Sequence, residues 1–545
     1  MKKLSLFCMI AMLSLGMVSC SDDQSLDANI DSSLQNADKL YMSIKVEYPS
    51  TSSRAGETDT ENGQNAENVV KNVRLMLLEE NANTSSSPIL AQGYVDGKIV
   101  GNDMYYTIPI NKEDILKAMG DAESKTVSLW VVCNYGSVEN VNDVDYIKKY
   151  SDGNEGIDQF NANVADDGFL MSNAAHVTKK LEKANFSENP YKPYDLGTIK
   201  VERSVARFDY RVAFTGDGAT YTTKFNLSDG ENAKKVSVQL TAAALTNMNK
   251  SFYSFRRVSA DGKAVSTEIL GAETGDNYVV STNIDHKLET ENIHEDASKD
   301  FFYACNTSVN EFKFVTLPIV TNGTNDTQNG IKAGDYARLF YCTENTLPQA
   351  DKGLNQKNGV STGVVFRGRL STEGNEDENN TEYGVDINST EETVKANPNI
   401  YVFNGVLLGT WAKVAEKAAS DASLKAAYLH VGEEENAAKA TEANFTVYSR
   451  EKIGGESGYF MYYYYWNQHR KNSSSTEMGP MEYAVVRNNV YKLYVTKISA
   501  FGHPSNTEND PYPVNPNDPN EKSDYYFQVN VEVQPWVVRQ NDIEF

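Results

Sequence analysis

The sequence predicts an all-β fold of antiparallel β-sandwiches with a few short helices. Strand-forming aromatic residues are abundant, with 32 Tyr and 21 Phe in 545 residues. Short runs in which apolar and polar residues alternate recur between clusters of Gly, Asn and Asp. Because so little helical periodicity separates these runs, antiparallel sandwiches are favoured over units of strand, helix and strand.

The alternating runs predict the strands in order along the chain. They cover residues 40–48, 69–78, 127–134, 199–214, 236–244, 312–320, 338–342, 363–370, 445–448, 459–466, 490–498 and 525–533. Residues 410–429 have roughly helical spacing of apolar side chains, and residues 112–119 form a shorter helix candidate. We therefore expect two helical segments in an otherwise β-rich chain.

Three segments between these runs are polar and predict no regular structure: residues 50–68, 371–393 and 504–524. The second is acidic. The third carries Pro504, Pro511, Pro513, Pro516 and Pro519, which predicts an extended spacer ahead of the last strand.

The N-terminus has the pattern of a secretory signal. Lys2 and Lys3 precede an apolar run of about fifteen residues, which is too short to span a membrane. The run ends in small residues before Cys20, a pattern typical of bacterial lipoproteins, in which the cysteine thiol is acylated. An ordinary signal peptide that contains a cysteine is the alternative. The exported chain is then held at the membrane by acyl chains.

The net charge of the chain and the motifs it lacks exclude several classes of function. Lys and Arg number 51 and Asp and Glu 75, and the formal charge of −24 argues against nucleic acid and anionic lipid as ligands. We find no nucleophile elbow, zinc-binding histidine pair or calcium loop in the sequence, so we expect no enzyme activity, no cofactor and no metal. The sequence leaves open whether the acidic residues 373–382 hold Ca²⁺ and whether any carboxylates pair for glycoside hydrolysis. After export the cysteines are Cys133, Cys305 and Cys342 besides Cys20, and the sequence leaves open whether one disulfide forms among them.

Two strands near the ends of the chain have matching patterns. Residues 40–48 place Leu40, Met42, Ile44, Val46 and Tyr48 on one face, and Tyr41, Ser43, Lys45 and Glu47 on the outward face. In the C-terminal strand, Phe527, Val529, Val531 and Val533 alternate with polar residues, and Trp536, Val538, Ile543 and Phe545 follow.

Taken in order, these features resemble the minor-fimbrium type of Bacteroidales fimbrilin, the shaft subunit of type V pili. A lipoprotein signal is followed by the strand 40–48 and a polar loop with a lone arginine, Arg54. The strands 201–210 and 236–244 follow. Residues 487–498 lead to the proline-rich segment, and residues 531–538 precede the end of the chain at Phe545.

The resemblance implies two tandem transthyretin-like sandwiches. It divides the chain into a signal peptide (1–19), a propeptide with a plug strand (20–54), an N-terminal sandwich (55–250) and a C-terminal sandwich (251–545). An arginine-specific protease would cut after Arg54, leaving Ala55 as the mature N-terminus. The plug strand, with Leu40, Met42, Ile44, Val46 and Tyr48, would then yield its groove to a donor strand. The following residues of another copy would form that donor: Phe527, Val529, Val531, Val533, Trp536, Val538, Ile543 and Phe545.

The same resemblance implies the setting of the protein. The precursor is an outer-membrane lipoprotein and the mature form belongs to an extracellular fimbria that supports adhesion and biofilm. Its partners are other copies, accessory fimbrial subunits and the maturation protease, and the sequence names no receptor. Head-to-tail contacts that do not close produce a filament.

Other interpretations stay open. Residues 40–48 and 525–545 are equally typical of the first and last strands of a stable sandwich. A glycan-binding surface lipoprotein would use the aromatic run 459–466 to stack on sugars, whereas we favour this run as a core strand. A tip or anchor subunit of a fimbria is a further alternative.

Overall fold

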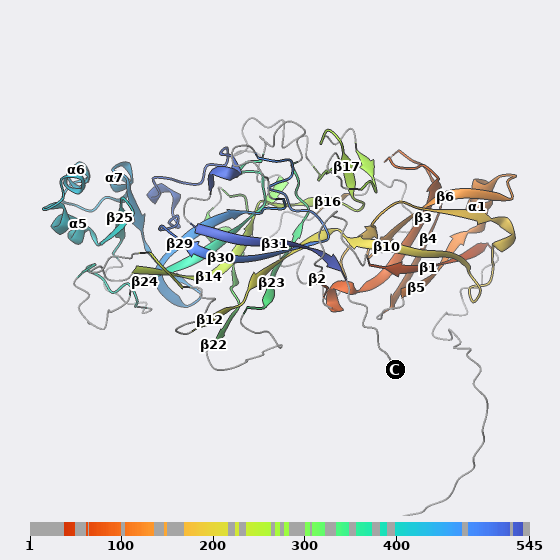
Figure 1. The fold of residues 1–545 in the computed structure, drawn as a ribbon, viewed down its shortest axis with the longest axis horizontal. Helices are drawn as coiled ribbons and strands as arrows, with labels where there is room; N and C mark the ends of the chain where they lie inside the picture. Colours follow the sequence, from red (N-terminus) through yellow and green to blue (C-terminus); the bar gives the residue numbers. More distant parts are fainter. Residues whose placement is uncertain are drawn as a thin grey trace, which may run out of the picture.

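The computed structural model describes residues 38–48, 61–63, 65–84, 86–99, 104–135, 147–149, 168–215, 224–227, 236–262, 267–272, 277–282, 300–305, 308–321, 334–347, 356–372, 382–389, 398–470, 478–523 and 527–537. Strands dominate these residues and helices are few, which confirms the predicted all-β class. The molecule is elongated, with a large sheet at one end and the helices α5, α6 and α7 at the other (Figure 1).

The large sheet contains eight strands, and alternation predicted four of them, from the runs at residues 40–48, 69–78, 127–134 and 199–214. In spatial order they are β3 (Val70–Glu79), β4 (Ile89–Ile99), β5 (Met104–Asn111), β1 (Lys39–Glu47), β10 (Tyr194–Arg203), β8 (Met171–Asn173), β6 (Ser124–Cys133) and β9 (Val177–Glu182). β3 also pairs with β6, from Val73 opposite Cys133 to Glu79 opposite Val127. The strands from β3 to β6 in this order therefore form a closed ring, and β1 is one member of it.

Two further sheets form the middle of the molecule. One contains β2 (Glu61–Asn62), β31 (Phe527–Val537), β30 (Asn489–Ile498), β11 (Val205–Arg211) and β23 (Tyr336–Thr343). The other contains β13 (Lys224–Asn226), β14 (Val236–Thr246), β24 (Gly363–Thr372), β29 (Glu456–Trp466), β28 (Arg450–Ile453) and β21 (Val315–Thr316). Apolar side chains of both sheets share one core, in which the rings of Tyr210 and Phe366 lie 5.6 Å apart.

Short strands complete the structure. The pairs are β12 (Ala213–Thr215) with β22 (Ile319–Thr321), β15 (Met248–Asn249) with β20 (Phe301–Phe302), and β16 (Ser251–Tyr253) with β7 (Ile147–Lys149). The triplets are β18 (Glu268–Ile269), β17 (Arg257–Ser259) and β19 (Tyr278–Val279), and β26 (Val406–Gly409), β25 (Ile400–Phe403) and β27 (Phe445–Tyr448).

The helix predicted at residues 112–119 is confirmed as α1 (Lys112–Met119). The side chain of Asn111 accepts hydrogen bonds from the backbone N–H groups of Glu113 and Asp114, which satisfies donors that a helix N-terminus leaves free. Ile115 and Met119, four residues apart, face the core. Gly120 ends the helix with a φ of 57°, a conformation that glycine adopts at little cost.

Other predicted elements differ in detail. The helix expected at residues 410–429 is two helices, α5 (Trp411–Ala418) and α6 (Ala422–Val431), because Asp421 caps a new N-terminus. α7 (Ala437–Glu442) follows. Residues 312–320 are a strand only in β21 and the start of β22. The run 199–214 is divided among β10, β11 and β12.

The aromatic run of β29 lies in the core. Every residue from Tyr459 to Trp466 is at most 9% exposed, as the core-strand interpretation predicted. A surface platform for stacking on sugars is therefore not formed by these rings. Cys133, Cys305 and Cys342 are buried free thiols, and burial raises the pKa of each thiol, that of Cys133 to about 12.

Sheet membership changes within one turn of the chain. β10 belongs to the eight-stranded sheet and ends at Arg203. β11 begins at Val205 in the sheet of β2, β31, β30, β11 and β23, which we call the central sheet. β11 and β14 then pair with β23, β24 and β30, from the later half of the chain. By sheet membership the change falls at Ser204, whereas the predicted domain boundary lies near residue 250.

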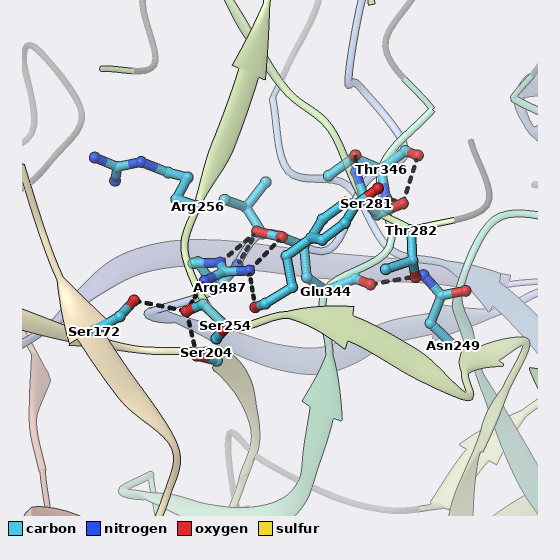
Figure 2. A network of polar contacts seen from close by, with 12 residues as sticks. Ser172, Ser204, Asn249, Ser254, Arg256, Ser281, Thr282, Glu344, Thr346 and Arg487 are labelled. Atoms are coloured by element: carbon cyan, nitrogen blue, oxygen red, sulfur yellow. Dashed lines mark hydrogen bonds and ion pairs between the residues drawn. The ribbon is translucent and has the colours of Figure 1, made fainter. Parts of the chain in front are cut away.

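A buried polar network joins the two parts at this point (Figure 2). Arg487 donates to both carboxylate oxygens of Glu344, at 3.1 and 2.9 Å, and to the backbone oxygens of Tyr253 and Ser254. The hydroxyl of Ser172, in β8, donates to the same Ser254 oxygen at 2.6 Å. The large sheet and the central sheet thus share one hydrogen-bonded carbonyl.

The ion pair at the centre of this network predicts a large stability effect. Arg487 and Glu344 side chains are 0% and 1% exposed. Replacing Arg487 by Met leaves the Glu344 carboxylate buried without its cation, and we expect a loss of about 3–5 kcal/mol of unfolding free energy. Urea unfolding followed by tryptophan fluorescence measures it. K497M, at an exposed position of β30, is the matched control with an expected change below about 0.5 kcal/mol. An R487M effect no larger than that control contradicts the prediction.

Candidate functional site

The predicted plug strand is β1, and it is paired along both edges. On one side it runs antiparallel to β5, from Lys39 opposite Asn111 to Val46 opposite Met104. On the other side it runs parallel to β10, from Met42 opposite Tyr194 to Glu47 opposite Lys200. β1 therefore lies between β5 and β10 and is the strand that connects them in the sheet.

The inward face of β1 is buried. Leu40, Met42, Ile44 and Val46 are at most 3% exposed and belong to the core of the large sheet. Burying four such side chains stabilises the strand in its slot by about 6–12 kcal/mol, an upper estimate from area removed from water. If β1 left, these four side chains would leave with it and uncover the core residues against which they pack.

The opposite face differs from the sequence expectation at one residue. Ser43, Lys45 and Glu47 are partly exposed, and Lys45 pairs with Glu47 at 2.8 Å. Tyr41, predicted to point outward into solvent, is only 2% exposed. Its backbone N–H donates to the oxygen of Ser187 at 2.8 Å, so the chain around Ser187 lies next to the start of β1.

The Leu40 end of β1 is irregularly paired. Tyr41 lies opposite Pro109 in a non-hydrogen-bonded pair, because the Tyr41 N–H donates to Ser187 on the other side of β1, so the ladder with β5 accommodates the proline. The parallel ladder with β10 begins only at Met42 and shifts register between Ser43 and Lys45. Opposite this irregularity Gly197 has a φ of 91°, a conformation that favours glycine.

The other end of β1 is held by polar contacts that we call the Tyr48 anchor (Tyr48, Glu67, Asn68 and Arg203). The Tyr48 hydroxyl donates to the backbone oxygen of Asn68 at 2.9 Å, and the guanidinium of Arg203 lies 4.8 Å from the centre of its ring. Arg203 also donates to the backbone oxygen of Glu67 at 3.1 Å and to the side chain of Asn68. Glu67 and Asn68 belong to η2 (Asn65–Asn68).

The anchor extends into the central sheet through Glu67, which is 0% exposed. Its carboxylate accepts from Arg207 at 3.0 Å and from the hydroxyl of Tyr341 at 2.6 Å. Burial lowers the pKa of Arg203 to about 10, although Tyr48 and the Glu67 carboxylate act in the opposite direction. Burial also raises the pKa of Tyr48, so its hydroxyl keeps the proton that it donates.

The proline-rich segment is not the free spacer that the sequence predicted. His503 pairs through its backbone with Tyr462 of β29, at 2.8 and 2.9 Å. Gly359 donates to the oxygen of Pro516 at 2.8 Å, and Asn520 donates to the oxygen of Gln356 at 3.1 Å. Proline lacks a donor but keeps its acceptor, and the segment uses such carbonyls to bind the body of the protein.

The C-terminal strand β31 pairs within its own chain. It runs antiparallel to β30, from Phe527 opposite Ile498 to Pro535 opposite Asn489. Trp536 and Val537 pair in parallel with Glu61 and Asn62 of β2. The predicted donor residues Phe527, Val529, Val531, Val533 and Trp536 all lie in β31. The C-terminal end of β31 therefore pairs with residues 61–62, which lie within the polar segment 50–68.

Several predicted site residues lie outside the described residues: Cys20, Arg54, Ala55, Val538, Ile543 and Phe545. Within the part of the chain that the structure describes, no group of three metal-ligating side chains occurs, and no helix is long and apolar enough to cross a membrane. The residues that the sequence analysis missed are Glu67, Asn68 and Arg203. Arg203 occupies a position that Ile199, Val201 and Val205 make apolar in an alternating run, which is a detectable signal. Glu67 stands in a polar segment and gives no such signal.

Comparison with known proteins identifies the C-terminal region. Residues 457–542 match the family model described as major fimbrial subunit protein type IV, fimbrillin, C-terminal. This region contains β29, β30 and β31, and the match confirms the resemblance to fimbrilins there. No protein of curated function matches the sequence.

Solved structures of fimbrial and cell adhesion proteins align with the chain along most of its length. A fimbrilin from Porphyromonas gingivalis W83 is 13% identical, with a TM-score of 0.36, and covers 92% of this chain and 99% of its own. The tip fimbrial protein Mfa3 from Porphyromonas gingivalis is 11% identical, with a TM-score of 0.31, covering 91% and 100%. A candidate cell adhesion protein from Parabacteroides distasonis is 12% identical, with a TM-score of 0.37, covering 93% and 99%.

Attachment of the proline-rich segment predicts a pH effect. The Ser505 hydroxyl donates to the carboxylate of Glu451 in β28, and burial raises the pKa of Glu451 from 4.5 to about 7. The folded state therefore holds this proton more tightly than the unfolded state, so the wild type loses stability as the pH rises from about 4.5 to about 7. E451Q removes this loss.

We expect E451Q to be more stable than wild type at pH 8 by about 1 kcal/mol, after discounting for partial solvent exposure, and by less at pH 5. Thermal melting of both proteins at the two pH values measures the difference. A difference that is equal at both pH values contradicts the prediction.

Proposed function

We propose, from the fimbrillin match of residues 457–542, that this chain is the shaft subunit of a cell-surface fimbria that supports adhesion and biofilm. It would be exported as a lipoprotein acylated at Cys20, and matured by cleavage after Arg54. The mature subunits would then polymerise by exchange of β1 for the C-terminal strand of another copy. The precursor is then an outer-membrane lipoprotein, and the mature form is part of an extracellular filament.

The observation that carries this proposal is the position of β1. It closes a ring of strands between β5 and β10, yet it precedes the loop with Arg54 and belongs to the propeptide. A cut in that loop leaves β1 bound by noncovalent contacts alone. Its loss would leave the edges of β5 and β10 unpaired and would empty the space that its four buried side chains fill, which is the acceptor that strand addition requires.

The C-terminal strand has the alternation of apolar residues that a replacement for β1 needs. Phe527, Val529, Val531 and Val533 repeat the alternation of Leu40, Met42, Ile44 and Val46. To donate them, β31 would detach from β30 and β2 while the proline-rich segment stays bound to the body. Other copies, accessory subunits and an arginine-specific protease are the partners that this proposal needs.

Cleavage of purified protein that begins after Cys20 tests the proposal. With an arginine-specific protease we expect a new N-terminus at Ala55 and a ladder of multimers that resists SDS without heating. Because the apolar face of the tail would fill the groove, V529D/V531D/V533D should abolish the ladder. Q528D/N530D/Q534D is the matched control with the same added charge on the other face.

The uncut variants are first compared by thermal melting, so that loss of folding is separated from loss of assembly. Cut wild-type protein that remains monomeric contradicts the shaft assignment. Multimers that persist in V529D/V531D/V533D contradict the role given to the tail.

A further inference from the structure

We infer that cleavage alone does not release β1, and that an incoming strand displaces it from the Leu40 end toward the Tyr48 anchor. Tyr48 is then a positioning residue, whose contacts are the last to break and limit the rate of exchange. This inference rests on the proposed function and specifies how the exchange proceeds.

Noncovalent contacts hold β1 whether or not the loop after it is intact. Both edges of the strand are paired, and Leu40, Met42, Ile44 and Val46 are removed from water. None of these contacts involves the loop. Spontaneous departure would expose all of them at once, so the cut strand is expected to remain in its slot.

The two ends of β1 are held unequally. At the Leu40 end, Leu40 and Tyr41 have no partner in the β10 ladder, and on that side the Tyr41 N–H donates to the Ser187 oxygen. An incoming strand can therefore compete first for the Ser187 oxygen and the start of β10 at Tyr194. The register shift between Ser43 and Lys45 lies next on its path and is a second weak point in the same ladder.

The Tyr48 end opposes displacement. The Tyr48 hydroxyl donates to Asn68, and its ring lies on the guanidinium of Arg203, which in turn binds Glu67 and Asn68. Glu67 is fixed by Arg207 and Tyr341. The partners of Tyr48 thus belong to the part of the chain that stays in the mature subunit, and they remain rigid while β1 is removed.

This order of events predicts second-order kinetics. If a second copy must begin to insert before β1 departs, the rate at which the fragment leaves rises in proportion to protein concentration. If β1 leaves first, that rate is independent of concentration. The two routes therefore differ in how the rate of fragment departure depends on protein concentration, which can be measured on the full chain.

The experiment uses protein that begins after Cys20, cut with an arginine-specific protease that is then inhibited. Native size-exclusion chromatography follows the N-terminal fragment over time at several protein concentrations. We expect the fragment to co-elute with the body in dilute protein and to depart faster in concentrated protein.

Variants of Tyr48 separate its two contacts. Y48F keeps the ring over Arg203 and loses the hydrogen bond, and we expect departure roughly 5-fold faster. Y48A loses both, and we expect departure roughly 10- to 100-fold faster. Y191A removes a tyrosine that is 52% exposed near the other end of β1, and should leave the rate unchanged.

Departure that is independent of concentration, or equal rates for wild type, Y48F and Y48A, would overturn the inference while multimers still support strand exchange. Absence of both departure and multimers at every concentration would overturn the proposed function itself. If Y48A melts at a lower temperature before cutting, the comparison of Y48F with wild type still decides.

Discussion

Closure of the large sheet by β1 is the constraint on which the rest of this structure depends. β5 and β10 are brought together only through β1, and the ring from β3 to β6 is complete only while β1 is present. A ring of strands has no free edge, which removes the risk that such edges template aggregation. If this closing strand belongs to a propeptide, as we propose, the same protection is removable, because cleavage of one peptide bond would turn the closed sheet into an acceptor.

The buried charges explain how the large sheet and the central sheets stay in register around this removable strand. Arg203, Arg207 and Arg487 each bind carboxylate or carbonyl groups from distant parts of the chain. Taking such groups out of water is costly unless each is paired and hydrogen-bonded, so only one arrangement satisfies them. Glu67 lies within the polar segment 50–68 that follows β1, and its contacts with Arg207 and Tyr341 hold it independently of β1.

The sequence predicted the elements whose signal is local. Alternation located β1, β24, β29 and β30, and the spacing of apolar side chains located α1. It did not predict that β1 runs parallel to β10, or that β11 pairs with β23 and β30, because register between distant strands leaves no trace in either strand alone. The proline-rich segment looked free because prolines lack donors, yet its carbonyls find donors on Gly359 and other residues. Glu67 was missed because its partners come from β11 and β23, which are distant in the sequence and leave no signal next to it.

In the proposed scheme, cleavage would not change any contact of β1. It would change the competition between β1 and a strand of another copy for the place between β5 and β10. An uncut β1 is tethered next to its own slot, at an effective concentration in the millimolar range for a short flexible link. A strand from another copy at micromolar concentration competes at a disadvantage of about a thousandfold, or about 4 kcal/mol. The replacement strand buries side chains of similar size, so it gains little from better contacts. Cutting the loop abolishes the tether, after which a displaced β1 is diluted and cannot return at the same rate. The free energy that drives assembly would then come from the lost tether, and the buried contacts would set only how slowly the exchange occurs.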